Sequence, residues 1–276
     1  MTTHTLPNDT PEAADELRRL LRIMAALRDP ERGCPWDRAQ GFDTIAPYTI
    51  EEAYEVADAI ARKDWTALAD ELGDLLFQVV YHAQMAAEDG RFDFAAIARG
   101  IADKMIRRHP HVFGEEKRAT AAAQTEAWEA QKAAERAGRA ETRVLDGIPL
   151  ALPALTRALK LARRAARTGF DWPDAAAVLD KLAEETEELR AELASPAPDP
   201  ARLADEVGDM LFVLANLARK LEVDPEAALR GANAKFERRF GAVEAALAEA
   251  GRRPEQASLA EMEALWQAAK AAERPR

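Results

Sequence analysis

The chain contains one nine-residue stretch twice, as Ala69-Asp-Glu-Leu-Gly-Asp-Leu-Leu-Phe77 and as Ala204-Asp-Glu-Val-Gly-Asp-Met-Leu-Phe212, 135 positions apart. In each copy a Glu and an Asp three residues apart share one helical face. Apolar residues follow each Asp directly, so the acidic side chains are expected beside a core. With 276 residues, the chain is long enough for two such units.

A second acidic motif, Glu-Glu-x-x-Glu, precedes each copy. Its residues are Glu51, Glu52 and Glu55 in the first half, and Glu184, Glu185 and Glu188 in the second. Positions 185 and 209, like 188 and 206, are centred on 197, and the matching pairs 52/74 and 55/71 are centred on 63. Position 197 lies in a proline-rich loop, and a short loop makes consecutive helices antiparallel neighbours. Each half therefore predicts a hairpin on which two acidic pairs face each other.

Four inward carboxylates repel one another unless a cation lies between them. The two sets are Glu185, Glu188, Glu206 and Asp209 in the second half, and Glu52, Glu55, Glu71 and Asp74 in the first. All-oxygen ligands suit Mg²⁺ or Mn²⁺. A solvated acidic face is the simpler interpretation of one acidic run, but the duplication argues against it. A di-iron centre is disfavoured because it typically uses Glu-x-x-His, and the second half contains no histidine.

The chain is rich in alanine and leucine and poor in β-branched runs, which predicts an all-α fold of tandem helical bundles. We expect a polar tail over 1–16, a first unit over 17–132, a charged linker over 133–151 and a second unit over 152–272. The second unit is predicted to contain helices over 153–168, 174–194, 200–220, 224–250 and 259–272.

Composition narrows the classes of function. The 38 basic and 49 acidic residues give a net charge of −11, which argues against a protein that coats nucleic acid. The single cysteine, Cys34, excludes internal disulfides and fits a reducing cytoplasm. The polar N-terminus has no signal core, and no apolar run reaches membrane-spanning length. We therefore expect a cytoplasmic protein with no nucleic-acid or membrane partner.

A basic cluster follows the second acidic set. Lys235 and Arg239 are four residues apart, Arg238 lies beside them and Asn233 lies one turn back. Near a carboxylate-bound metal such a cluster suits a polyphosphate, although pairing with neighbouring glutamates on a solvated helix is also consistent with the spacing. Trp266, on the charged tail helix, is suited either to stack on a base or to anchor that helix.

Together these motifs resemble the MazG family of nucleoside triphosphate pyrophosphohydrolases. The resemblance includes the tandem acidic motifs and covers nearly the whole chain after the first fifteen residues. Its further motifs are Gly33-Cys-Pro-Trp-Asp37, Arg107-Arg-His-Pro-His-Val-Phe113, Gly169-Phe-Asp-Trp172 and Lys235-Phe-Glu-Arg-Arg-Phe240. It implies an all-α, usually dimeric, Mg²⁺-dependent enzyme, with Mn²⁺ as a substitute. The family cleaves nucleoside triphosphates between the α and β phosphates, giving a monophosphate and pyrophosphate.

The resemblance also implies roles for individual residues. The metal ligands would be Glu185, Glu188, Glu206 and Asp209; the nucleotide would contact Lys181, Glu184, Asp205, Asn233, Lys235, Arg238, Arg239 and Trp266. Glu184 or Glu185 would accept a proton from the attacking water, and Lys235 and Arg239 would assist at the phosphates. In the first unit Glu52, Glu55, Glu71 and Asp74 correspond, but Tyr48 replaces Lys181 and Ala102 replaces Asn233. We therefore expect weak metal binding and little turnover there.

A non-catalytic regulator that senses nucleotides remains the alternative from another class of function, and the preferred nucleotide is left open.

Overall fold

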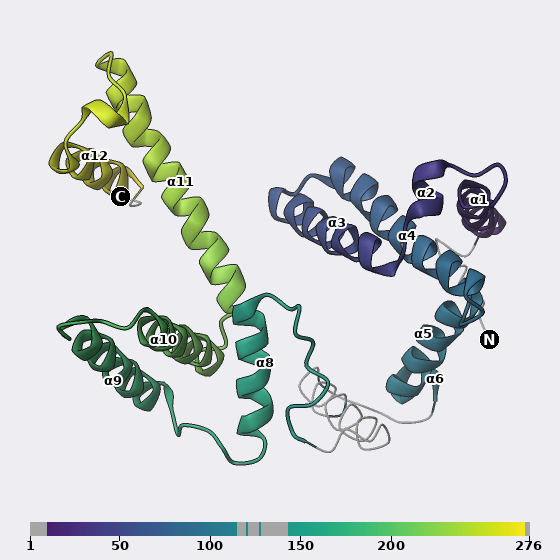
Figure 1. Ribbon diagram of the computed structural model, residues 1–276, viewed down its shortest axis with the longest axis horizontal. Helices are drawn as coiled ribbons and strands as arrows, with labels where there is room; N and C mark the ends of the chain where they lie inside the picture. Colours follow the sequence, from purple (N-terminus) through teal and green to yellow (C-terminus); the bar gives the residue numbers. More distant parts are fainter. Residues whose placement is uncertain (1–9, 115–119, 121–126, 128–142, 274–276) are drawn as a thin grey trace. The chain divides into compact units, whose positions relative to one another are not determined.

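The computed structural model describes residues 10–114, 120, 127 and 143–273, and every regular element in those ranges is a helix (Figure 1). The all-α prediction is therefore confirmed. The chain separates into two compact units, residues 1–131 and 132–276. Most of the predicted linker, residues 133–142, lies outside the described ranges.

The first unit contains a long helical hairpin flanked by shorter helices. Its elements are α1 (Pro11–Leu27), α2 (Pro35–Ala39), α3 (Phe42–Arg62), α4 (Trp65–Glu88), α5 (Phe94–Arg108) and α6 (Pro110–Phe113). Helix α1 begins inside the segment that the sequence assigned to a polar tail. It does so because the Thr10 side chain accepts a hydrogen bond from the Ala13 backbone N–H at 3.1 Å, and Pro11 occupies the first turn.

The α3–α4 hairpin turns where the acidic symmetry predicts. Lys63 adopts a left-handed conformation with φ of 56° and ends α3, and Asp64 caps α4 by accepting from the Ala67 N–H at 3.1 Å. Beyond the acidic residues the hairpin packs on α1 through a buried cluster of Met24, Ile45, Val80, Tyr81 and Met85.

The second unit repeats the hairpin and adds a projecting pair of helices. Its elements are α8 (Ala154–Ala166), α9 (Ala175–Leu193), α10 (Pro200–Lys220), α11 (Pro225–Glu249), a 3₁₀ turn η1 (Pro254–Gln256) and α12 (Leu259–Ala272). Each end lies within two residues of its predicted position. Asp174, Asp199 and Asp224 cap α9, α10 and α11 through their carboxylates, which explains why the sequence signals were reliable.

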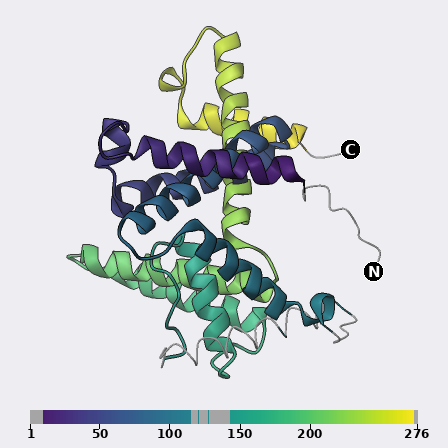
Figure 2. The same cartoon turned by 90° about the vertical axis from the view of Figure 1, so that its right-hand side faces the viewer.

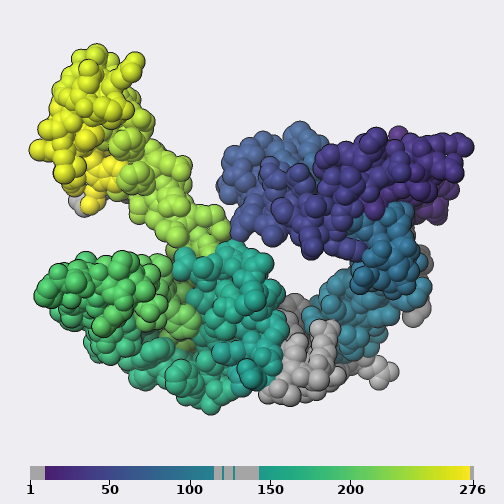
Figure 3. Space-filling model, in the orientation of Figure 1, coloured from purple at the N-terminus to yellow at the C-terminus, as the bar shows by residue number. Residues whose placement is uncertain are grey.

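Contacts within the second unit fix the hairpin turn and the start of α11. Glu192 is buried; it accepts from the Asp199 N–H at 2.8 Å and pairs with Arg202 at 3.2 Å. The Thr156 N–H donates to Glu226 at 3.4 Å, which joins α8 to the first turn of α11. Helix α11 then extends away from the α9–α10 hairpin, and α12 folds back against it (Figures 1, 2 and 3).

None of the described helices is both long enough and apolar enough to cross a lipid bilayer.

Candidate metal and nucleotide site

The second hairpin brings together carboxylates that are distant in sequence. Helix α9 contributes Glu185 and Glu188, and α10 contributes Glu206; one oxygen from each lies within 4.8 Å of the other two. The first hairpin repeats the arrangement with Glu52 and Glu55 of α3 and Glu71 of α4. The duplicated spacing thus produces two similar oxygen-rich groups, the donor set that hard divalent cations prefer.

The fourth predicted ligand of each set lies outside the close group. Asp209 and Asp74 are exposed, each one turn beyond its Glu partner on the same helix. Asp74 still acts on the group, because burial first, and then the charges on Asp74 and Glu55, raise the pKa of Glu52. Each hairpin therefore gathers three carboxylates closely, with the fourth at the edge.

Mutual repulsion is visible in the second group too. The pKa of Glu188 is raised, first by desolvation and next by the charge on Glu185, while Lys181 opposes both effects. A cation among these oxygens would relieve the repulsion. The chemistry of the donor set therefore fits Mg²⁺ or Mn²⁺.

Lys181 distinguishes the second group from the first. Its ammonium lies 2.8 Å from a carboxylate oxygen of Glu184 and 2.8 Å from one of Glu185, which is only 5% exposed. Its pKa is raised, chiefly by the hydrogen bond to Glu184 and then by that to Glu185. The first unit has Tyr48 at this position, with its ring against the edge of Trp36 at 6.3 Å. Among the described residues, the second hairpin has a cation at this position in direct contact with its acidic group, and the first hairpin has a tyrosine there.

The predicted phosphate-binding residues lie on α11. The Arg238 Nε donates to Glu273 at 2.7 Å, and the Arg239 Nε donates to the same carboxylate at 2.8 Å. Hydrogen bonds from Arg238 and then Arg239 lower the pKa of Glu273 to about 2. Lys235 is exposed. Within the described part of the second unit, no hydrogen bond or ion pair joins these three basic residues to the α9–α10 carboxylates.

Two further residues on α10 and α11, Asp205 and Asn233, are exposed, so their side chains are accessible to a ligand.

Trp266 has a packing role in this conformation. Its ring centre lies 5.2 Å from that of Phe236, and the Arg239 guanidinium lies 5.7 Å from the ring centre. These contacts fix α12 on α11. These contacts correspond to the anchoring role, and contact of Trp266 with a nucleotide stays a prediction.

Asn216 is a polar residue that the acidic spacing did not single out. It lies on α10 two turns beyond Asp209, is 1% exposed, and its Oδ1 accepts a hydrogen bond from Arg219 at 2.6 Å. The sequence contained a signal for this residue. Asn216 lies on the apolar face of its helix, and the matching position in the first unit is Tyr81.

Fold and site together define a class: tandem all-α units, each with a helical hairpin on which three carboxylates lie close together. The family model of the MazG nucleotide pyrophosphohydrolase domain matches residues 40–113 and 174–243, one match for each hairpin. The chain therefore belongs to the MazG nucleotide pyrophosphohydrolase family.

Individual relatives align over nearly the full length. A protein of Escherichia coli strain K12 named nucleoside triphosphate pyrophosphohydrolase is 51% identical over 256 residues, covering 93% of this chain and 97% of the relative. A Thermotoga maritima protein named nucleoside triphosphate pyrophosphohydrolase/pyrophosphatase MazG is 41% identical, covering 94% and 97%. The YabN protein of Bacillus subtilis is 42% identical, and the match spans 51% of its length.

Proposed function

We propose that this protein is a Mg²⁺-dependent nucleoside triphosphate pyrophosphohydrolase. It hydrolyses ribo- or deoxyribonucleoside triphosphates between the α and β phosphates, in the cytoplasm, and releases a nucleoside monophosphate and pyrophosphate. The observation that carries the proposal is the group of Glu185, Glu188 and Glu206, whose oxygens lie within 4.8 Å of one another. The names of the full-length relatives support the reaction class.

The residues suit hydrolysis by water. Glu185, Glu188 and Glu206 would hold Mg²⁺, with Asp209 at the edge of the set. Bound Mg²⁺ neutralises phosphate charge and acidifies a water molecule. The water oxygen bonds to phosphorus, the bridging P–O bond between the α and β phosphates breaks, and Glu184 or Glu185 accepts the proton. Both carboxylates contact Lys181, which holds them in place.

The basic cluster would bind the phosphate chain. Arg238 and Arg239 already bind a carboxylate, that of Glu273, in a bidentate arrangement that a phosphate can replace. Lys235 is exposed one turn before them and adds a point charge. Substrate phosphates therefore compete with Glu273 for these arginines.

The matched hairpins provide the decisive test. The double substitution Glu185→Ala with Glu188→Ala should lower turnover by at least about 100-fold, because the cation and the proton acceptor lose their positions. The equivalent Glu52→Ala with Glu55→Ala should retain most activity, since Tyr48 replaces Lys181 in the first unit. Turnover is measured as release of pyrophosphate, separated from orthophosphate, with Mg²⁺ and with Mn²⁺.

Three outcomes would contradict this assignment. Nucleotide binding without any pyrophosphate release would indicate the non-catalytic regulator. If only the first-unit variant is inactive, the first unit is the catalytic one. Inactivity of both folded variants would mean that the units share one site. Circular dichroism verifies folding in each case.

A further inference from the structure

The turn of the second hairpin contains a buried carboxylate that the proposed chemistry does not use. Glu192 lies near the end of α9 and is 8% exposed. One of its oxygens accepts a hydrogen bond from the Asp199 N–H at 2.8 Å, and the other lies 3.2 Å from the Arg202 Nε. A buried charge is costly unless it is paired and hydrogen-bonded, and both oxygens of Glu192 have a partner at the start of α10. We call this group of contacts the turn clamp.

The turn clamp lies next to the carboxylates of the candidate cation site. Glu185, Glu188 and Glu192 are spaced i, i+3 and i+7, so they follow one face of α9. On α10, Arg202 precedes Glu206 by four residues, just as Glu188 precedes Glu192 on α9. Four residues correspond to about 6 Å along a helix axis. The turn clamp therefore joins the two helices about one turn away from the carboxylates that they carry.

The carboxylate group depends on the spacing of the two helices. Glu185 and Glu188 come from α9 and Glu206 comes from α10, and one oxygen of each lies within 4.8 Å of the other two. Mg²⁺ requires nearly ideal octahedral geometry at about 2.0–2.1 Å from each oxygen, whereas Ca²⁺ accepts flexible arrangements at about 2.3–2.6 Å. Ligands on two helices keep a strict geometry only while the helices keep their spacing and register. Loss of the turn clamp is therefore expected to weaken Mg²⁺ binding more than Ca²⁺ binding.

The first hairpin has a shorter turn and lacks this carboxylate. Residues 63–64 separate α3 from α4, whereas residues 194–199 separate α9 from α10. Ala59 occupies the position of Glu192 and is fully buried. The short turn is closed by the backbone, since the Asp64 N–H donates to the Ala59 carbonyl oxygen at 3.0 Å. The second hairpin has a longer loop, and the side chain of Glu192 supplies the connection across it.

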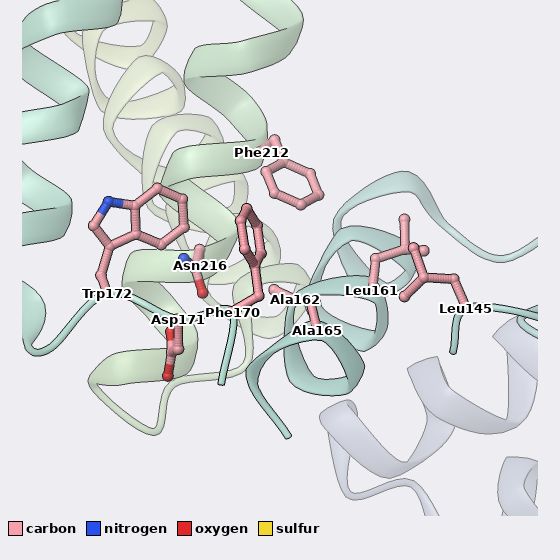
Figure 4. Close-up of a pocket in the computed structure, with 9 residues that line it drawn as sticks. All are labelled: Leu145, Leu161, Ala162, Ala165, Phe170, Asp171, Trp172, Phe212 and Asn216. Carbon is pink, nitrogen blue, oxygen red and sulfur yellow. The ribbon is translucent and has the colours of Figure 1, made fainter. Parts of the chain in front are cut away.

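The open end of the second hairpin is held separately. There Asp171, in the loop before α9, accepts a hydrogen bond from Arg219 and lies 2.8 Å from the Lys220 ammonium. These ion pairs lie beside an aromatic pocket of about 300 Å³ that α8, the same loop and α10 form (Figure 4). Asn216, which lines this pocket, is ten residues from Glu206, or about 15 Å along the helix axis. The turn clamp is therefore the connection closer to the carboxylates.

We infer that Glu192 is a positioning residue for the cation site of the second hairpin. By binding the start of α10, it holds α9 and α10 at the spacing at which their three carboxylates can bind one small cation. It acts through the two helices rather than by contact with the cation. The inference rests on the proposed function only for the part that this cation plays in turnover.

Binding of Mg²⁺ and of Ca²⁺ to the full chain is measured by calorimetry. Every variant also carries Glu52→Ala with Glu55→Ala, so that the first hairpin contributes little binding. Glu192→Ala, which copies Ala59 of the first unit, should weaken Mg²⁺ binding about 10- to 100-fold, the usual effect of removing a group that orients metal ligands. Ca²⁺ binding should change less than about threefold, because Ca²⁺ accepts displaced oxygens. Glu192→Gln should recover most of the Mg²⁺ affinity, since its amide oxygen can still accept from the Asp199 N–H.

Turnover gives a second readout. In Glu192→Ala, the Mg²⁺ concentration for half-maximal pyrophosphate release should rise by about 10- to 100-fold as well. The maximal rate at saturating Mg²⁺ should change little, because the ligands and the proton acceptor are all present. General damage to the unit would instead lower the rate at every Mg²⁺ concentration. Glu187→Ala is the matched control, because it removes an exposed carboxylate of α9 that pairs with Arg190, and it should behave like its parent chain.

Three results would overturn the inference: unchanged Mg²⁺ affinity in Glu192→Ala, equal losses for Mg²⁺ and Ca²⁺, or an equal loss of Mg²⁺ affinity in Glu187→Ala. The second would indicate general damage to the site, and the third an effect of net charge alone. Glu192→Asp keeps the charge but is too short to reach both partners, so it repeats the test with the same expected loss if Glu192→Ala does not fold. Absence of pyrophosphate release by the unaltered protein, with Mg²⁺ affinity still dependent on Glu192, would refute the hydrolase and leave the positioning role standing.

Discussion

Two of the residues that differ between the units lie at matching positions of the two hairpins: Lys181 against Tyr48, and Asn216 against Tyr81. At the carboxylates, Lys181 contacts Glu185, whereas Tyr48 packs on Trp36. At the far end of the hairpin, Asn216 borders a pocket, whereas Tyr81 is buried in a core. Both differences exchange a polar side chain for an aromatic one. The acidic residues are present in both halves. They therefore do not by themselves identify which unit is catalytic.

Arg28 packs against Tyr81 in the first unit, at the position where Asn216 lines a pocket in the second unit. Its guanidinium bonds both oxygens of Glu88 at 2.6 to 3.0 Å and the Asp37 carbonyl at 2.6 Å, and lies 5.7 Å from the Tyr81 ring centre. Its side chain is only 10% exposed. One planar group thus joins the end of α1 to α2 and to the end of α4.

Arg28→Ala is expected to destabilise the first unit by about 3 kcal/mol, because charged hydrogen bonds contribute about 1.5–3 kcal/mol and Glu88 would lose its partner. Arg28→Lys should recover less than half, since a point charge cannot reach both Glu88 and the carbonyl. Urea denaturation measures the change. A loss below about 0.5 kcal/mol in Arg28→Ala, the range of neutral surface substitutions, would contradict this role.

At the scale of elements, α12 is held to α11 by Glu273 and the Trp266 contacts, and the first of these depends on pH. The pKa of Glu273 falls from the ordinary 4.5 to about 2 in the folded chain. A lowered carboxyl pKa stabilises the docked helix fully above pH 4.5, and that contribution is lost as the pH falls toward 2.

We therefore expect α12 to loosen between about pH 4.5 and 2, observed as a change in Trp266 fluorescence. Glu273→Gln should show the loosened signal already at neutral pH and should lose this step of the acid titration. Trp266→Phe identifies the contribution of this tryptophan among the five. If Trp266 fluorescence depends on pH in the same way in Glu273→Gln and in the unaltered chain, the Glu273 carboxylate does not hold α12 on α11.

The sequence predicted the elements well where local chemistry determines them. Capping aspartates and prolines fixed the helix ends, and the acidic symmetry fixed both hairpin turns. The sequence placed residues 1–16 in a polar tail, whereas α1 begins at Pro11, because Thr10 caps the helix and Pro11 occupies its first turn. The site was only partly predictable: spacing on adjacent helices gathers Glu185, Glu188 and Glu206, but it says nothing about the direction of α11.

The remaining features depend on contacts between distant segments. Glu273 reaches Arg238 and Arg239 only because the chain reverses after α11. The aromatic pocket needs α8, the loop before α9 and α10 together. Neither periodicity nor residue spacing specifies such three-segment packing, although the exchange of Tyr81 for Asn216 between copies was a signal in the sequence.

At the scale of the whole molecule, both hairpins carry apolar stripes that are exposed among the described residues of each unit. On α10, Val207, Leu211 and Leu214 follow an i, i+4, i+7 spacing and are 46%, 48% and 42% exposed. On α4, Leu72 and Leu76 are 49% and 41% exposed at the matching positions. Stripes of this kind mark surfaces that pair with another protein surface, and we propose a second copy of this chain as the partner.

A homodimer predicts that one charge on a stripe changes the mass in solution. Leu211→Asp should convert the protein from about 60 kDa, twice the 30.3 kDa chain, to a monomer, because an unpaired charge cannot be buried in an apolar interface without a large penalty. Leu76→Asp tests the first hairpin in the same way, and Arg190→Asp places the same side chain on the polar side of α9. Light scattering after size-exclusion chromatography gives the masses.

Leu211→Asp could become monomeric while Leu76→Asp stays dimeric. If Leu211→Asp then also loses turnover with every carboxylate intact, a second copy completes the site at the second hairpin. A monomeric unaltered chain, or a dimer that persists in both stripe variants, would contradict pairing through these helices.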